Sequence, residues 1–590
     1  MAYYPIADYG IIGNLHTTAL ISLRGSIDFM CLPRFDSPTV FASILDDKKG
    51  GSFSFTCADD DTNYKQLYLP GTNILLTRFL SSDGIAEVTD FMPIARAKED
   101  FAIFRRLKGV HGAHTIQVNI EPSFDYARTG CKAEKLDDGS GYRLLDPTGE
   151  QPGMLLLTSA ELEVTEGGLA GEIELAAGQD LDFILTLENG RYFENDFLPL
   201  FQETRDYWTN WSAKSTYNGL WKESVIRSAL ALKLLTSAEF GSTVAAATFG
   251  LPEVIGGERN WDYRFAWIRD SAFTMYAFLR LGYREEAEGF IDWIQGQCMA
   301  ELQLMYGVDG ATELTEVSLE HLEGYEKSQP VRIGNGAYDQ KQMDIYGELI
   351  DTIYLYNEAG GSITNEFWRG ISGLVEYVVE HWKDKDHGIW EVRSGKQQFL
   401  HSAVCCWVAL DRAMKIAVAR SLPHPRAEWR KVRDEIYAEI FDNFWNEDLQ
   451  FYPQFKGSDT VDASALLMPL LRFVSSREPR WLKTFEAIEE KLTADVLVFR
   501  YKNEDGSHDG LEGEEASFTI CSFWYAECLA RIGRVDEATV VMQKLLGYGN
   551  HLGLFSEEIG MHGEQLGNFP QAFSHLSLIS AAFQIDKQGE

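Results

Sequence analysis

The sequence is poor in cysteine and contains no long apolar segment. Eight cysteines among 590 residues are too few for a disulfide scaffold, and no two of them have the CxxC spacing of a metal site. No stretch reaches the roughly 18 apolar residues of a membrane-spanning helix. The N-terminal segment lacks the basic stretch and apolar core of a secretory signal. We therefore expect a cytoplasmic protein with reduced thiols, no membrane partner and no metal ligands.

Positive charge is also scarce. The chain has 53 Lys and Arg against 89 Asp and Glu, a formal net charge of −36. Phosphate polyanions would be repelled over most of such a surface, which argues against nucleic acid and anionic membranes as partners. A small neutral ligand fits this balance better, although a high negative charge also serves simply to keep a protein in solution.

Flexible linkers, low-complexity tracts and clear internal repeats are missing as well. Up to about residue 190 the apolar residues alternate, as in Ile116, Val118 and Ile120, which is typical of strands. From about residue 203 the spacing becomes helical, and SAFTMYAFLRLGY predicts a helix that ends at Gly282. The pattern predicts an antiparallel β-sandwich over residues 1–202, a helical linker over 203–240 and a helical domain over 241–590.

Aromatic and charged residues gather in NWDYRFAWIRD, residues 260–270, just before that helix. Aromatic rings stack on the apolar face of a sugar, and the neighbouring Arg269 and Asp270 could together donate to and accept from adjacent hydroxyls. The alternative is structural, with Asp270 in an ion pair at the N-terminus of the helix.

Carboxylates in three later loops are candidates for acid and base. Glu391 follows Trp390 in the turn DHGIWE, where desolvation would favour the protonated form that a general acid needs. A solvated loop carboxylate is the alternative. The second role has two competing loops, residues 511–515 with Glu514 and Glu515, and residues 555–559 with Glu557 and Glu558. Glutamates 514 and 515 could instead be dipole partners of a helix.

Four ordered segments decide between these possibilities: NWDYRFAWIRD, LEGYEKSQPVRIGNGAYDQKQMDIYGELID, the HGIWE turn, and FSEEI with HGEQLGNFPQAFSHLSLISAA. Together with the N-terminal YPIADYGIIGNLHTTALISLRGSIDFMC, they resemble glycoside hydrolase family 15, in its glucoamylase-like and trehalase-like branch. The resemblance implies a β-sandwich followed by an (α/α)6 barrel, the six-hairpin toroid, with the active site in loops at one end of the barrel.

The resemblance also implies the roles of individual residues. Glu391 matches the general acid and Glu557 the general base, with Glu558 as the adjacent alternative. The remaining substrate-binding residues that it implies are Tyr263, Trp267, Arg269, Asp270, Trp390, Arg500 and Tyr501. No cofactor or metal is implied. Starch-active relatives carry a second carboxylate directly after the acid, whereas this chain has Val392, which makes long maltodextrins less suitable substrates.

The sequence thus predicts an inverting, exo-acting α-glucoside hydrolase that releases β-glucose from the non-reducing end of trehalose or short α-gluco-oligosaccharides. Alternatives are a glucoamylase or isomaltose-type enzyme acting on α-1,4 or α-1,6 glucans, an inverting disaccharide phosphorylase, and a binding protein without turnover. The preferred linkage and the oligomeric state stay open.

Overall fold

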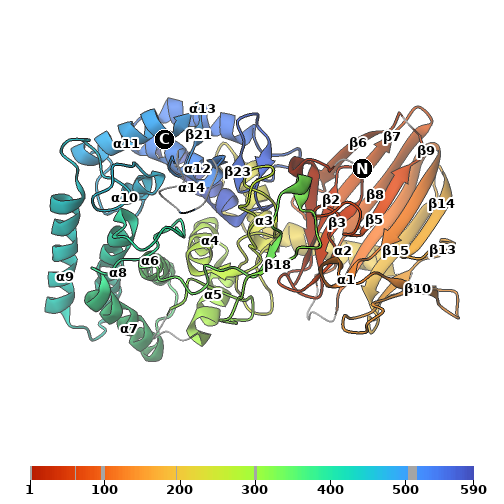
Figure 1. Cartoon of the computed structure of the whole chain (residues 1–590), viewed down its shortest axis with the longest axis horizontal. Helices are drawn as coiled ribbons and strands as arrows, with labels where there is room; N and C mark the ends of the chain where they lie inside the picture. The colour runs from red at the N-terminus through yellow and green to blue at the C-terminus, as the bar shows by residue number, and fades with distance from the viewer. Residues whose placement is uncertain are drawn as a thin grey trace.

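The computed structural model describes residues 3–59, 61–94, 100–193, 196–297, 302–502, 510 and 515–589. Antiparallel strands form the N-terminal part of the molecule, and a ring of helices forms the rest (Figure 1). The predicted fold class, a β-sandwich domain followed by an (α/α)6 barrel, is confirmed.

Fifteen strands of the described residues make up the N-terminal part. They are β1 Tyr9–Gly13, β2 Thr18–Ser22, β3 Ile27–Cys31, β4 Thr39–Phe41, β5 Ser52–Cys57, β6 Asn63–Tyr68, β7 Leu75–Leu80, β8 Gly84–Phe91, β9 Ala102–Glu121, β10 Lys132–Lys135, β11 Gly141–Leu145, β12 Met154–Leu157, β13 Glu163–Val164, β14 Leu169–Ala176 and β15 Asp180–Leu187. The short helical turn α1, Phe124–Ala127, follows β9.

The 20-residue strand β9 connects the two layers of the sandwich. Its first part pairs with β8 and β15, and its second part pairs with β5 and β14, always antiparallel. The alternation read from the sequence is confirmed here, because Ile116, Val118 and Ile120 are all buried. The intervening residues point to the other face, as the pleat of a strand requires.

The helices form two concentric rings (Figure 1). The inner ring consists of α4 Ile268–Leu281, α6 Asp344–Glu358, α8 Leu400–Arg420, α10 Leu467–Leu470, α12 Thr519–Arg531 and α14 Ala572–Gly589. The outer helices are α3 Lys222–Leu234, α5 Arg284–Gly296, α7 Asn365–His381, α9 Arg426–Glu439, α11 Pro479–Leu492 and α13 Val535–Leu546. Each inner helix packs against the next, and α14 closes the ring against α4.

Short strands stiffen the loops between these helices: β16 Ala266–Trp267, β17 Met305–Tyr306, β18 Val317–Ser318, β19 Arg332–Ile333, β20 Thr493–Ala494, β21 Leu497–Val498, β22 Ser517–Phe518, β23 Glu558–Ile559 and β24 Gln565–Leu566. The predicted helix over residues 271–283 is α4, and Gly282 ends it in the left-handed conformation. The loops before α4, α6, α8, α12 and α14 meet at one end of the ring, the end that holds the N-termini of these helices.

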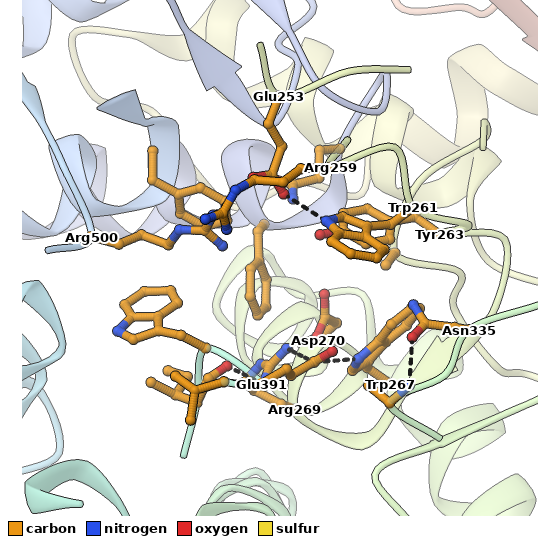
Figure 2. A pocket seen from close by; sticks show the side chains of 18 of the residues that line it. Glu253, Arg259, Trp261, Tyr263, Trp267, Arg269, Asp270, Asn335, Glu391 and Arg500 are labelled. Atoms are coloured by element: carbon orange, nitrogen blue, oxygen red, sulfur yellow. Dashed lines mark hydrogen bonds and ion pairs between the residues drawn. The ribbon is translucent and has the colours of Figure 1, made fainter. Parts of the chain in front are cut away.

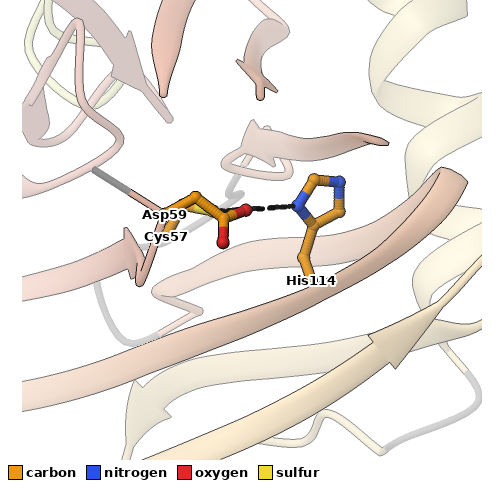
Figure 3. Close-up of side chains that lie close together, drawn as sticks. All are labelled: Cys57, Asp59 and His114. Carbon is orange, nitrogen blue, oxygen red and sulfur yellow. Dashed lines mark hydrogen bonds and ion pairs between the residues drawn. The ribbon is translucent and has the colours of Figure 1, made fainter. Parts of the chain in front are cut away.

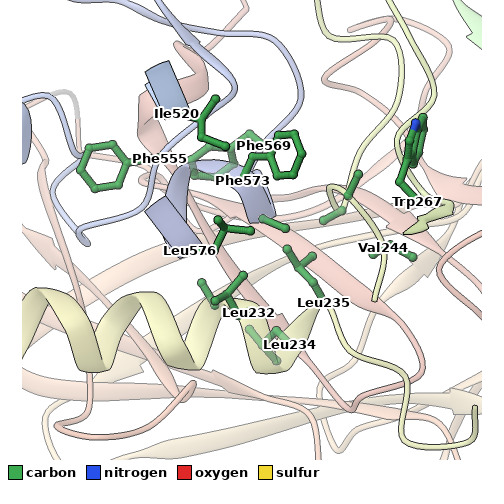
Figure 4. Packing of buried hydrophobic residues seen from close by; sticks show 14 of the residues in the cluster. Leu232, Leu234, Leu235, Val244, Trp267, Ile520, Phe555, Phe569, Phe573 and Leu576 are labelled. Atoms are coloured by element: carbon green, nitrogen blue, oxygen red, sulfur yellow. The ribbon is translucent and has the colours of Figure 1, made fainter. Parts of the chain in front are cut away.

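The chain passes from sandwich to ring through α2, Phe197–Ser212, and α3. Figure 4 shows leucines of α3 beside Phe573 and Leu576 of α14 in one apolar cluster. That cluster continues into the sandwich, where the ring of Phe249 meets those of Phe29 at 5.6 Å and Tyr126 at 5.7 Å between centroids. The two parts of the molecule therefore share a core. Among the described residues, no helix is both long and apolar enough to cross a membrane.

Candidate active site

A pocket of about 760 Å³, counting its open mouth, lies at the end of the ring where the inner helices begin. It is lined by Ala245, Glu253, Arg259, Trp261, Tyr263, Trp267, Arg269, Asp270, Asn335, Ala337, Ile389, Trp390, Glu391, Val392, Arg393, Arg500, Tyr501, Phe518, Gln571 and Phe573. Eight of the nine predicted site residues are in this set. The ninth, Glu557, lies directly behind the wall.

Glu391 lies at one side of the pocket, with a fifth of its side chain exposed. Its Oε1 accepts a hydrogen bond from the Trp267 indole at 2.8 Å and from the Arg269 guanidinium at 3.2 Å. A second guanidinium nitrogen of Arg269 donates to the carbonyl of Ile389 at 2.8 Å. The WIRD segment thus holds the turn that carries the predicted acid (Figure 2).

The backbone of that turn is unusual. Glu391 has a φ of +58°, in the left-handed region that costs a side-chain-bearing residue roughly 1–2 kcal/mol. Asp386 anchors the start of the turn, because its carboxylate accepts from Met343 N at 2.8 Å and from Ser402 Oγ at 2.7 Å. Strain that the surroundings enforce in this way is typical of functional positions.

Asp270 is buried beside Arg269, with its Oδ2 3.5 Å from the guanidinium Nε. That oxygen has no hydrogen-bond partner among the described residues. Burial raises the pKa of the Asp270 carboxyl to about 7, against the pull of the Arg269 charge, and the Glu391 charge adds to the rise. A buried, unpartnered acceptor at the wall of a pocket is suited to a ligand hydroxyl.

Glu557 is fully buried and bonds to the pocket wall through Tyr263. The Tyr263 hydroxyl donates to its Oε1 at 2.6 Å, and the amide of Asn568 donates to its Oε2 at 3.4 Å. Burial raises the pKa of Glu557 to about 8, the charge of Glu253 raises it further, and the hydrogen bond from Tyr263 opposes the rise. Tyr263 is thus the contact between this carboxylate and the pocket.

Glu558 points in another direction. It is the first residue of β23, and its carboxylate accepts from the amide of Ala516 at 3.1 Å and lies 3.5 Å from the Arg500 guanidinium. Glu557 is the residue directly before this strand. Successive side chains of an extended segment face opposite ways, so Glu557 and Glu558 have different surroundings. Of these two glutamates, only Glu557 accepts a hydrogen bond from Tyr263, the pocket residue whose ring packs beside Trp267.

Arg500 is held by carboxylates. Its guanidinium lies 2.8 Å from Glu515, 3.1 Å from Glu253 and 3.5 Å from Glu558. Glu515 also accepts from Arg259 at 2.6 Å and from the Tyr501 hydroxyl at 3.5 Å. Glu515 therefore binds two arginines. It lies four residues before the first residue of α12, the helix of which it was the alternative dipole partner. The competing residues Glu512 and Glu514 lie outside the described residues.

These contacts place Glu391 in one wall of the pocket and Glu557 behind another wall, where Tyr263 connects it to the pocket. Figure 2 shows Glu391, Arg269 and Asp270 on one side and Glu253, Arg259 and Arg500 on the other. Tyr263, whose hydroxyl donates to Glu557, belongs to the latter side. Its ring centroid lies 5.4 Å from that of Trp267, whose indole donates to Glu391.

Several residues of the pocket were not predicted from the sequence: Glu253, Arg259, Trp261, Asn335, Phe518, Gln571 and Phe573. Glu253 had no distinguishing signal among 89 acidic residues. Its partner Arg500 is 247 positions away, and only the closed ring brings the two together. Gln571 precedes α14 and Phe573 lies in its first turn, and the mostly apolar sequence of this helix indicates core packing and not a binding surface.

Known proteins resemble this chain along almost its whole length. The family model of glycosyl hydrolases family 15 matches residues 219–583, and the model described as trehalase-like, N-terminal matches residues 2–192. A trehalase of Mycobacterium tuberculosis is 36% identical over 99% of this chain and 90% of its own length. A trehalase of Thermoplasma volcanium is 36% identical over 99% of this chain and 94% of its own length.

A solved structure of a bacterial glucoamylase complexed with acarbose has the same fold. It superposes with a TM-score of 0.73 over 99% of this chain and 94% of its own, at 13% identity. With the family model over more than half of the chain and relatives that match almost all of it, the identification made from the sequence motifs is confirmed. The chain belongs to glycosyl hydrolases family 15 and is a glycoside hydrolase.

Proposed function

We propose that the protein hydrolyses α-glucosides by single displacement, that it removes β-glucose from the non-reducing end, and that trehalose is its preferred substrate, with short α-gluco-oligosaccharides next. The observation that carries this proposal is the attachment of Glu391 and Glu557 to the adjacent rings of Trp267 and Tyr263 at one pocket. Inversion needs one protonated and one ionised carboxyl on opposite faces of the sugar, with room for a water.

In the proposed reaction, Glu391 protonates the glycosidic oxygen and Glu557 takes a proton from the attacking water. The bond from the anomeric carbon to the leaving oxygen breaks as the bond to the water oxygen forms. The water has to enter beside the Tyr263 hydroxyl, because that group stands between Glu557 and the pocket. Each proton transfer contributes roughly 10²- to 10⁴-fold to the rate.

The charges of the pocket suit a neutral, hydroxyl-rich ligand. Arg269 is paired with Asp270 and Glu391, and Arg500 with Glu253 and Glu515, so an anion would have to displace existing partners. The unpartnered Asp270 oxygen offers an acceptor for a hydroxyl of the terminal glucose. Trp261 and Trp390 supply ring surface near it.

Two features favour a disaccharide. The likeness to trehalases covers both parts of the chain, including the N-terminal sandwich. At the pocket, Val392 follows the acid and offers an apolar side chain where starch-active relatives carry a carboxylate. The proposal includes the cytoplasmic location, which suits the cysteines of the described residues, all free thiols.

The first experiment is a substrate panel. Purified protein is incubated with trehalose, maltose, isomaltose, maltotriose and soluble starch, and released glucose is followed by proton NMR. We expect the highest kcat/KM on trehalose, with β-glucose from the attacked unit and α-glucose from the leaving unit appearing first in equal amounts. Preference for starch or isomaltose would favour the glucoamylase-type alternatives. Initial products that contain α-glucose but no β-glucose would exclude inversion. Glucose 1-phosphate formed only in phosphate buffer would identify a phosphorylase.

The second experiment separates the two carboxylates. Glu391→Gln should lower kcat on trehalose by about 10²-fold or more, yet keep much of its activity on α-glucosyl fluoride, whose leaving group needs little protonation. Glu557→Ala should lose activity on both substrates and recover part of it with azide, which replaces the activated water. Glu558→Ala is the matched control, and azide should not rescue it. Azide rescue of the Glu558 variant alone would reassign the base.

A further inference from the structure

A second group of potential ligands lies inside the ring, between α6 and α8. Asp344 and Glu348 are one turn apart on α6, and His401 and Cys405 are one turn apart on α8. All four side chains are fully or almost fully buried. Pairs at positions i and i+4 project from the same side of a helix, so two such pairs on adjacent helices can converge on one point.

From this convergence we propose that Asp344, Glu348, His401 and Cys405 form a structural binding site for a divalent metal ion of the zinc type. None of the four is among the described residues that line the active-site pocket. The proposed ion therefore lies outside the pocket, and this inference stands independently of the substrate.

The distances fit tetrahedral coordination. The His401 Nε2 lies 3.2 Å from Glu348 Oε1 and 3.5 Å from Cys405 Sγ. Ligand atoms at tetrahedral angles, with zinc bonds of about 2.3 Å to sulfur and about 2.0 Å to nitrogen or oxygen, are separated by roughly 3.3 Å for N and O and roughly 3.6 Å for N and S. Asp344 Oδ2, at 3.9 Å from the same Nε2, supplies a fourth ligand after a small movement.

Unpartnered oxygens point to a cation at this place. Both Asp344 oxygens and Glu348 Oε2 are buried and have no hydrogen bond to any described residue. Arg269 cannot fully compensate them, because its guanidinium already bonds to Glu391 and to the Ile389 carbonyl. Buried carboxylates without partners are costly, and a bound cation removes that cost.

A second mixed cluster, in the sandwich, provides a contrast. Figure 3 shows Cys57, Asp59 and His114 close together. There the Asp59 Oδ2 already has Ser81 Oγ at 2.9 Å, Cys57 Sγ at 3.3 Å and His114 Nδ1 at 3.4 Å. Protein donors thus satisfy the carboxylate of this cluster in the sandwich, the outer cluster, whereas both Asp344 oxygens and the Glu348 Oε2 between α6 and α8 lack donors among the described residues.

The ligand types determine the kind of ion. Thiolate and imidazole favour zinc and its neighbours over magnesium or calcium, which prefer oxygen ligands alone. Glu348 also lines a separate pocket at the opposite end of the ring, together with Asp351 and Arg412, so the cluster lies beside a second cavity that is distinct from the active site.

The test uses the full-length protein, purified without a metal-affinity tag, stripped with chelator and titrated with cobalt(II). We expect about one cobalt per chain and a thiolate-to-cobalt charge-transfer band in the near ultraviolet, as a Cys-containing tetrahedral site produces. Cys405→Ser should abolish the band. Cys406→Ser is the matched control, because this neighbouring buried thiol faces the Met343 carbonyl and lies outside the cluster. It should leave the band unchanged.

A second measurement covers the case in which Cys405→Ser fails to fold. Glu348→Gln should weaken cobalt affinity by at least tenfold, and zinc should raise the melting temperature of the parent protein but not of this variant. The proposal is overturned if the parent binds no cobalt, or if the band survives Cys405→Ser. It is equally overturned if Cys57→Ser, in the outer cluster, is the variant that removes the band.

Discussion

At the scale of single residues, the pKa of Glu557 depends on its burial and on its neighbours Glu253 and Tyr263. Burial and the nearby Glu253 disfavour its ionised form, and the Tyr263 hydroxyl favours it. A general base must be ionised, so its raised pKa should move the fall in activity on the acid side to a pH above the value of about 4.3 expected for an exposed glutamate.

Replacing Tyr263 with phenylalanine removes the donor that stabilises the carboxylate. A hydrogen bond to a charged group contributes about 1.5–3 kcal/mol, which corresponds to roughly one to two pH units. The acid limb of kcat/KM should therefore move to higher pH by about that amount. Tyr501→Phe is the control, since its hydroxyl contacts Glu515. If the acid limb of kcat/KM moves in neither the Tyr263→Phe nor the Tyr501→Phe variant, the assignment of Glu557 as base is contradicted.

Gly567 packs directly against Glu557. A β-carbon at this position would lie 2.5 Å from Glu557 Oε2, and the φ of +72° already disfavours a side chain. Gly567→Ala should lower kcat by more than tenfold through displacement of the carboxylate. Gly563→Ala is a matched control, with a φ of +84° but its nearest contact, the Tyr548 ring, at 3.6 Å. Equal losses of activity would attribute the effect to backbone strain alone.

Sequence reasoning succeeded for residues whose signal is local. Trp390 and Glu391 are adjacent, and Trp267, Arg269 and Asp270 fall within four positions, so both groups could be named from short motifs. It could not identify Glu253 or Arg259, whose roles arise from partners more than 240 positions away. The resemblance to a known family supplied the choice of Glu557 over Glu558, which spacing alone left open.

At the scale of elements, α6 and α8 of the inner ring lie close together. Gly347 makes this possible, since a β-carbon there would lie 2.2 Å from the carbonyl oxygen of Cys405. The helical periodicity predicted long helices such as α8 and α4 successfully. It gave no indication of α10, a four-residue segment that completes the ring, because so short a segment has no period to detect.

Gly347→Ala should destabilise the protein by about 1–3 kcal/mol, because the added methyl group forces two packed backbones apart. Gly373→Ala, in the outer helix α7, is the opposite case. A β-carbon added at Gly373 would have no described atom within 4 Å, and alanine is the better helix former by about 1 kcal/mol. Thermal unfolding followed by circular dichroism should show a lower melting temperature for the first variant and an equal or higher one for the second.

At the scale of the whole molecule, the ring is joined to the sandwich by buried polar contacts as well as by the shared core. Arg264, next to Tyr263, donates to both Asp262 oxygens at 2.9 and 2.6 Å and to the Ser37 carbonyl of the sandwich at 2.7 Å. The sequence predicted both domain types. It could not predict this docking, because periodicity shows that a face is buried but not what covers it.

Arg264→Ala should cost about 3–5 kcal/mol of stability, because it leaves the buried Asp262 carboxylate without its cation. Activity should fall too, since Tyr263 and Trp267 belong to the same segment. Arg128→Ala, which breaks a partly exposed pair with Asp125, should cost less than about 1 kcal/mol. Urea unfolding and kcat/KM on the preferred substrate are the two measurements. Similar stabilities of the two variants would show that the docking contact is not important.

The common interior has a consequence for synthesis on the ribosome. The first 190 residues emerge with the apolar surface around Phe29 and Tyr126 uncovered, and the residue that covers it, Phe249, follows only later. The ring in turn cannot close until α14, the last helix, has been made. During translation the nascent chain therefore exposes apolar surface until α14 has been made, and during this stage the chain is most prone to aggregation.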